Sequence, residues 1–175
     1  MPVEMVVESI RAHILAPTRV VFLKERRRER YLPIIIGVPE ADAIAIKLQN
    51  AEVPRPLTHD LLSSMISALG GRVTHVVVND LVGETFYARI VLDVDGRHVE
   101  VDSRPSDAIA LAVRIDVPIY VEESVLEKGA IEPEEERAGA EGKPEEHIRE
   151  EQLAAFRDVI NQLNLDDLGG KPRKP

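Results

Sequence analysis

The chain has 175 residues and no cysteine, so disulfide bonds and thiolate metal sites are excluded and nothing indicates an oxidising compartment. Aromatic residues make up only 3% and the net charge is −9, which argues against a stacking platform for single strands and against tight nonspecific DNA binding. More than half of the excess negative charge lies in residues 132–175, so a local basic patch elsewhere is permitted.

Neither a signal peptide nor an apolar run of the about 20 residues needed to cross a bilayer is recognisable, so we expect a cytoplasmic protein without membrane contact. P-loop, GxGxxG and GxSxG motifs are absent as well. Nucleotide-hydrolase, dinucleotide-binding and serine-hydrolase functions are therefore not expected.

Three strands are expected at the start, over residues 5–15, 19–24 and 31–36. Pro33 cannot donate a ladder hydrogen bond, so the third strand should lie at a sheet edge or bulge there. Residues 25–30 form an arginine-rich hairpin tip between the second and third strands. This tip is either a solvated turn or a contact to phosphate groups through three consecutive guanidinium groups.

Two helices should follow, over residues 37–50 and 58–69. Pro39 is expected at the first helical position of the first helix, whose apolar residues run as far as Leu48. Thr58 is expected to cap the second helix, and Gly70–Gly71 should end it.

The next expected strands cover residues 72–79, 84–94 and 97–101, and Asp95–Gly96 is a strong hairpin signal. The alternation of Val99 and Val101 with acidic residues predicts a strand with one buried face.

The stretch from Val99 to Val121 organises the chain, because a strand, a polar turn, an apolar helix and a further strand follow one another there. Pro105 suits the first helical position, and Ala108–Val113 contain no polar residue. We therefore expect a helix buried on all sides, followed by a strand at 119–121 and a short helix at 122–128.

These elements predict an α+β fold, with a mostly antiparallel sheet packed against buried helices of small residues. We expect one domain over residues 1–131 and an acidic linker over 132–144. Residues 145–175 should form a C-terminal amphipathic helix followed by a disordered end. That helix would dock either on its own domain or on a neighbouring subunit of a homo-oligomer.

Several motifs resemble the bifunctional nuclease domain family. They are RPSDAIALAVR at 104–114 followed by VPIYV at 117–121, Gly37 with Glu40–Ala41, RPLTHDLL at 55–62 and TFYARI at 85–90. The resemblance covers residues 5–131 and keeps the order of the motifs. It implies nuclease activity towards RNA and DNA, with nucleic acid as substrate.

Cleavage of a phosphodiester needs an activated water, stabilisation of charge on the phosphate oxygens and protonation of the leaving oxygen. Carboxylates, often with histidine, do this around Mg²⁺ or Mn²⁺. Polar residues near the helix starts are the candidates for catalysis: Glu40, His59, Asp60, Asp102 and Asp107. Asp60 and Asp107 are the candidate metal ligands, and the substrate contacts are assigned to Arg55, Arg104 and Ser106.

A structural explanation stays open for the same residues. Glu40, Asp60 and Asp107 lie in first helical turns, where an acid is stabilised by the helix dipole by about 0.3–1 kcal/mol. If the helices pack with their starts aligned, these three acids converge. The sequence therefore leaves two functions: a metal-dependent nuclease with little sequence specificity, or a non-enzymatic module that binds an anion or a protein partner.

Overall fold

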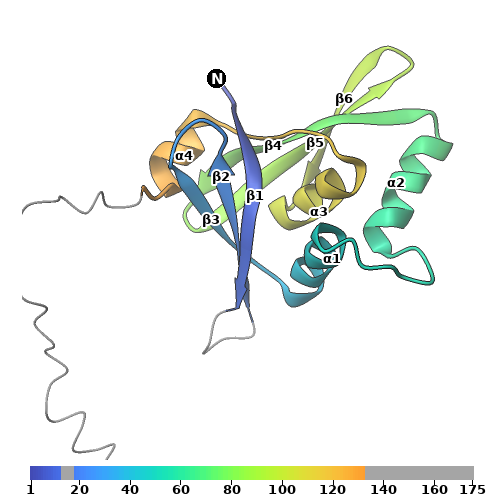
Figure 1. Cartoon of the computed structure of the whole chain (residues 1–175). Coiled ribbons are helices and arrows are strands. Elements are labelled where there is room, and N and C mark those ends of the chain that lie inside the picture. Colours follow the sequence, from blue (N-terminus) through green and yellow to red (C-terminus); the bar gives the residue numbers. More distant parts are fainter. Residues whose placement is uncertain (13–17, 133–175) are drawn as a thin grey trace, which may run out of the picture. The chain divides into compact units, whose positions relative to one another are not determined.

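In residues 1–12 and 18–132, which are the residues that the computed structural model describes, seven strands form one sheet and four helices accompany it (Figure 1). The strand order is β3-β2-β1-β7-β4-β5-β6, and among these pairings only β4 with β7 is parallel. The predicted α+β class with a mostly antiparallel sheet is therefore confirmed. The linker and amphipathic helix expected within residues 133–175 lie outside the described residues.

The first three strands form an antiparallel meander: β1 (Val3–Ala12), β2 (Arg19–Glu25) and β3 (Tyr31–Ile36). In β2, Val21 and Leu23 are completely buried, and Val20, Phe22 and Lys24 are half-buried. This is the alternation of a strand with one face towards the core. β3 lies at the edge of the sheet, which confirms the position predicted from Pro33.

The hairpin tip between β2 and β3 contains Arg26–Arg28, as expected, but Arg30 does not share its exposure. The Arg30 side chain is 11% exposed and donates hydrogen bonds to Glu25 (2.8 Å) and to both carboxylate oxygens of Glu123 (2.6 and 3.2 Å). Glu123, and to a lesser degree Glu25, hold the pKa of Arg30 above its ordinary value. Arg30 is therefore a structural cation that ties the hairpin to a distant helix.

Helix α1 (Val38–Leu48) follows β3 almost directly, with Gly37 as its N-cap. Pro39 occupies the second helical position rather than the predicted first, which costs nothing because the first-turn N–H groups have no intrahelical partner. Ala41, Ala43 and Ile44 are buried, but Leu48 is 47% exposed because it lies in the last turn, so the apolar face does not extend to it.

Helix α2 (Thr58–Ala68) begins differently from the prediction. Leu57, not Thr58, is the N-cap residue, and the Asp60 carboxylate accepts a hydrogen bond of 2.8 Å from the Leu57 backbone N–H. Thr58 is therefore the first residue of the helix, and the start of α2 is stabilised instead by the acid three residues after the cap, which binds the N–H of the cap residue. The end of the helix is confirmed, since Gly70 adopts a φ of 81° directly after Leu69.

The second half of the sheet contains three long antiparallel strands: β4 (Gly71–Val82), β5 (Thr85–Val94) and β6 (Arg97–Ser103). Asp95 and Gly96 have φ values of 53° and 75°, which confirms the predicted hairpin turn. The prediction for Val101 is wrong: its side chain is 43% exposed. β6 is the other edge of the sheet, so no further strand covers that side of it.

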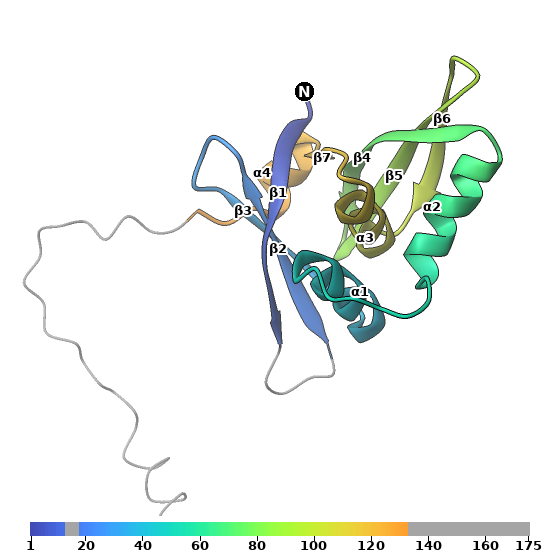
Figure 2. The same ribbon diagram turned by 45° about the vertical axis from the view of Figure 1, so that its right-hand side comes forward.

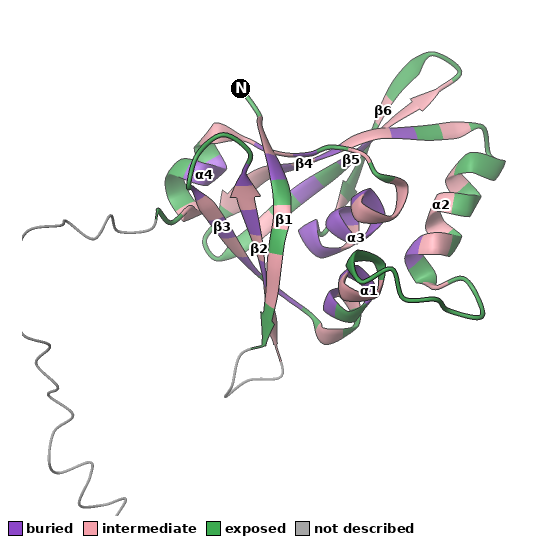
Figure 3. Ribbon diagram, in the orientation of Figure 1, coloured by how far each residue is buried: buried purple, intermediate pink, exposed green. Residues whose placement is uncertain are grey.

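The organising stretch forms α3 (Pro105–Ile115) and β7 (Ile119–Val121), and α4 (Glu123–Gly129) follows. Arg104 is the N-cap of α3 and Pro105 its first residue, as predicted. Every residue from Ala108 to Ala112 is at most 1% exposed, which confirms the buried helix (Figure 3). β7 has only three residues, yet it lies in the middle of the sheet between β1 and β4.

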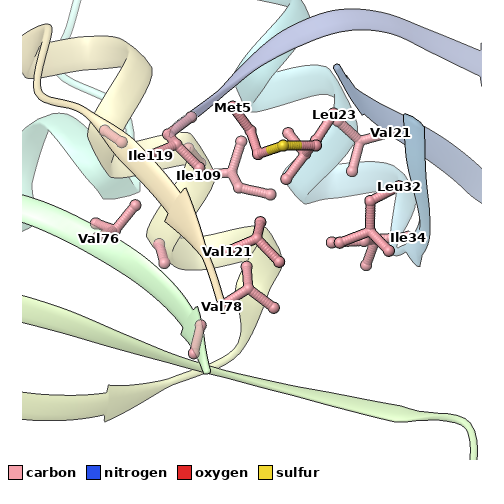
Figure 4. Close-up of a cluster of buried hydrophobic side chains, with 14 of the residues drawn as sticks. Met5, Val21, Leu23, Leu32, Ile34, Val76, Val78, Ile109, Ile119 and Val121 are labelled. Carbon is pink, nitrogen blue, oxygen red and sulfur yellow. The ribbon is translucent and has the colours of Figure 1, made fainter. Parts of the chain in front are cut away.

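The core lies where α3 and α1 pack against the sheet, as Figures 1 and 2 show. Figure 4 shows side chains of five strands and of α3 meeting in one cluster, which includes Met5, Val21, Leu23, Leu32, Ile34, Val76, Val78, Ile109, Ile119 and Val121. Helices α1 and α3 also pack against each other, and Ala41 and Ile44 of α1 belong to the same core as Ala108–Ala112. Within the described residues, every helix is too short or too polar to cross a membrane.

Candidate active site at three helix starts

The first turns of α1, α2 and α3 come together around one arginine. Arg104 donates from Nη2 to Glu40 Oε1 over 2.7 Å, and from Nε to Asp107 Oδ2 over 2.8 Å. The other Asp107 oxygen, Oδ1, lies 3.0 Å from His59 Nε2. We call Glu40, His59, Arg104 and Asp107 the helix-start network.

Local sequence explains why these side chains face one another. Glu40 and Asp107 lie in first turns, where free backbone N–H groups and the helix dipole favour a negative charge. Pro105 directs the chain from β6 into α3, which leaves Arg104 at the N-cap position beside Asp107. A Cβ atom at Gly37 would collide with Glu40 Oε2, so the absence of a side chain at Gly37 makes room for the carboxylate.

His59 is the buried member of the network, and its residue is only 7% exposed. Because a carboxylate accepts hydrogen bonds, we assign a ring proton to Nε2. Nδ1 has no hydrogen-bond partner among the described residues. His59 therefore fixes one oxygen of Asp107 from the protein interior, while Arg104 binds the other oxygen from the solvent side.

The charged side chains of the network differ in their exposure to solvent. The Arg104 side chain is 66% exposed, whereas those of Glu40 and Asp107 are 16% and 28% exposed. The hydrogen bonds that Arg104 donates, first to Glu40 and second to Asp107, raise its pKa above the ordinary value, so it is always charged. Two partly buried carboxylates thus share one exposed guanidinium.

Asp60 lies apart from the network although it follows His59 directly. Its Oδ1 accepts a hydrogen bond of 2.9 Å from Arg114 Nε, and its Oδ2 accepts the Leu57 N–H. The predicted convergence of three acids is therefore realised by Glu40 and Asp107, with His59 in place of Asp60. A surface hollow of about 210 Å³ borders Asp60 and Arg114 but none of the network residues.

The remaining candidates take separate positions. Asp102 is exposed on β6, opposite Arg89 of β5, and Arg55 is exposed in the loop before α2. Ser106 is 6% exposed in the first turn of α3. Within the described part of the chain, none of these three side chains is bonded to the network.

Sequence reasoning did not select Arg114 or Gly37 as site residues. Both belong to motifs that carry the family resemblance: Arg114 is the last residue of RPSDAIALAVR, and Gly37 precedes Glu40 in the other. Their roles depend on contacts across the fold, for which the sequence contains no local signal.

Comparison with known proteins matches residues 21–134, which include the whole network, to the bifunctional nuclease domain. The chain belongs to the bifunctional nuclease domain family. An uncharacterized protein of Mycobacterium tuberculosis is 42% identical to this bifunctional nuclease domain protein over 149 residues, which cover 85% of this chain and 87% of that protein. The resemblance seen in the sequence is thereby confirmed.

Plant relatives carry the family name. Bifunctional nuclease 2 of Oryza sativa subsp. japonica is 34% identical over 114 residues, which cover 63% of this chain and 35% of the rice protein. Bifunctional nuclease 1 of Arabidopsis thaliana is 33% identical over 93 residues, which cover 51% of this chain and 29% of that protein. The similarity to these proteins therefore spans about a third of their length.

The donor set of the network suits a hard cation. Glu40 Oε1 and Asp107 Oδ2 flank one position, since both bind the same guanidinium. Mg²⁺ usually takes one or two carboxylates and completes its coordination with water and substrate phosphates. In the described residues, no three His, Asp or Glu side chains are arranged as a metal cage. Glu40 and Asp107 are therefore the residues of the network that could hold a divalent ion.

Proposed function

We propose that this member of the bifunctional nuclease family hydrolyses phosphodiester bonds in RNA and DNA with little sequence specificity, and that the reaction depends on a divalent metal ion. The observation that carries the proposal is the helix-start network: two carboxylates, a buried histidine and an exposed arginine meet at the starts of three helices. The names of the plant relatives support the choice of nucleic acid as substrate.

In this proposal Arg104 binds the scissile phosphate. Its guanidinium is the most exposed group of the network, and a planar guanidinium matches two phosphate oxygens. When Arg104 turns towards substrate, its guanidinium exchanges hydrogen bonds to carboxylate oxygens for hydrogen bonds to phosphate oxygens, which are also negatively charged. Glu40 and Asp107 then become available as ligands of the divalent ion.

His59 keeps Asp107 in place during that exchange, because its hydrogen bond to Oδ1 does not involve Arg104. Holding a carboxylate at a fixed angle is the usual role of a buried partner behind a ligand or base. A bound Mg²⁺ or Mn²⁺ would supply Lewis-acid stabilisation of the phosphate and a more acidic water.

The roles of the other candidates remain predictions. Asp60 is proposed to act through α2 rather than on the substrate, because both of its oxygens are occupied by Arg114 and Leu57. Arg55 and Ser106 remain predicted substrate contacts, and Asp102 remains a predicted catalytic residue. Assembly as a homo-oligomer and a cytoplasmic location are likewise predictions.

Asp107→Asn tests the site most directly. The amide preserves size but removes the charge, so we expect cleavage to fall by orders of magnitude while stability falls by about 1 kcal/mol or less through the lost dipole interaction. Plasmid nicking and RNA degradation are measured with and without EDTA on identically purified proteins. Asp42→Asn is the matched control, since Asp42 is an exposed acid on α1 and should leave cleavage unchanged.

The outcomes separate the two functions. Cleavage that is abolished by EDTA and by Asp107→Asn, but not by Asp42→Asn, supports the nuclease. Equal, EDTA-insensitive cleavage by all three proteins would indicate a contaminating enzyme. In that case the exposed Arg104 and the net charge of −9 favour the alternative, a non-enzymatic module that binds a small anion or a protein partner.

A further inference from the structure

Arg114 is a buried cation that the proposed chemistry does not use. It lies in the last turn of α3, and its side chain is 4% exposed. Nε donates to Asp60 Oδ1 over 2.9 Å, and Nη1 donates to the carbonyl of Ala110 over 3.0 Å. The hydrogen bond to Ala110 holds the guanidinium on its own helix. The hydrogen bond to Asp60 therefore fixes α2 relative to α3.

Asp60 carries the connection into the first turn of α2. Its other oxygen, Oδ2, accepts the Leu57 backbone N–H over 2.8 Å. The carboxylate is therefore bonded both to the start of α2 and to the end of α3. His59, the residue next to Asp60, reaches the start of α3 through Asp107.

These two contacts fix the orientation of the first turn of α2. Asp107 lies in the first turn of α3 and Arg114 in its last turn, so two adjacent residues of α2 are bonded to two different side chains of α3. A turn that is held by two separate contacts cannot rotate about either of them. Loss of the Arg114 contact would leave His59 as the pivot.

Little else holds this turn. Residues 49–56, which lead into α2, are all exposed, and His59 is the only fully buried residue of that helix. The rest of α2 contacts α3 and β4 through half-buried side chains such as Leu62 and Ile66. The start of α2 therefore depends on its polar contacts.

We propose that Arg114 is a positioning residue of the candidate site: through Asp60 it fixes the first turn of α2, so that His59 Nε2 stays bonded to Asp107. The consequence for cleavage rests on the proposed function. The consequence for the His59–Asp107 hydrogen bond does not.

The test compares full-length protein with Arg114→Met, Arg114→Lys and Asp60→Asn. Arg30→Met is the matched control, because Arg30 is also a buried arginine with carboxylate partners but lies outside the helix-start network. The first readout is the His59 Nε2–H proton by NMR at one pH. It should exchange slowly in the wild type and in Arg30→Met, and rapidly in Arg114→Met and Asp60→Asn, with recovery in Arg114→Lys.

The second readout is cleavage. Misplacement of a positioned group by about 1 Å can cost about 10²-fold in rate, so we expect kcat of Arg114→Met to fall by about that factor with little change in KM. A folded Arg114→Met, or a folded Asp60→Asn if the former does not fold, in which the His59 proton still exchanges slowly would overturn the proposal. If wild-type protein does not cleave nucleic acid, the proposed function fails, and the exchange measurement still decides the role of Arg114.

Discussion

The missing side chain of Gly37 makes room for Glu40 in the helix-start network. Gly37 has an ordinary φ of −70°, so an alanine there would not strain the backbone. Its Cβ would instead displace the Glu40 carboxylate, whose Oε1 binds Arg104. At the residue scale, the site thus depends on a position that carries no functional group.

We expect Gly37→Ala to reduce cleavage to the level of Glu40→Gln, because both changes remove the same carboxylate from Arg104. The loss of stability should be about 1 kcal/mol or less, as alanine is only a poorer N-cap residue than glycine. Kinetics of the two single variants and of the double variant provide the check. If the two effects multiply in the double variant, Gly37 acts by another route.

Arg30 illustrates the cost of a buried charge without its partner. Glu25 is 7% exposed and loses its hydrogen-bond donor if Arg30 is removed. Arg30→Met should therefore lower the free energy of unfolding by about 3–5 kcal/mol. In the same urea titration, Arg27→Met in the exposed tip should change it by no more than about 0.5 kcal/mol. Equal effects of the two changes would show that the Arg30 cluster contributes no special stability.

At the scale of the element, α3 is the helix on which both the core and the site depend. Its middle consists of small and branched residues with no exposed surface, so α1 and the sheet approach it closely. Its first residue follows the N-cap Arg104, and its last turn carries Arg114. The same helix therefore contributes to the core through its middle and to the polar contacts of the site through Arg104 and Arg114.

Ala110→Leu tests the packing of α3. Ala110 is completely buried, so the larger side chain should overpack the helix and lower stability by about 1–3 kcal/mol. Ala68→Leu on α2 is the control, because Ala68 is exposed and leucine is a good helix former. Urea midpoints of the two variants give the comparison. A silent Ala110→Leu would mean that α3 is not tightly enclosed.

On the scale of the whole molecule, a three-residue strand joins the two halves of the sheet. β7 pairs with β1 on one side and with β4 on the other. The described chain then passes through α4, and Ile131 pairs with Tyr31 at the β3 edge. Residues 1–132 thus contain every described strand pairing, from one edge of the sheet to the other.

A protein that ends before Pro133 should therefore melt cooperatively, with the far-ultraviolet circular dichroism of a folded α+β domain. The strand pairings and the core described above are all retained in it. Thermal unfolding and light scattering of the truncated and full-length proteins are compared. Loss of cooperative melting would show that residues 133–175 complete the core. A smaller oligomer with folding intact would place them at a subunit interface.

The helices and strands of this protein follow from sequence patterns that extend over only a few residues. The alternation in Arg19–Lys24, the Asp95–Gly96 turn and Pro105 before an apolar run each depend on neighbours within a few residues. The order of the strands and helices, the edge position of β3 and the burial of α3 were therefore predictable. The bounds were less so, since β1 begins at Val3 rather than at residue 5 and β4 ends at Val82 rather than at residue 79. The family was also predictable, since its motifs are contiguous in the chain.

Which side chains meet depends on how the helices and strands pack against one another. Glu40 and Arg104 are 64 residues apart, and Asp60 reaches Arg114 over 54 residues. A sequence shows that an acid lies in a first helical turn, but the angle at which helices pack determines which cation it faces. The same holds for Val101, whose exposure follows from the edge position of β6. Side-chain partners are long-range contacts, and these arise only when the whole core has packed.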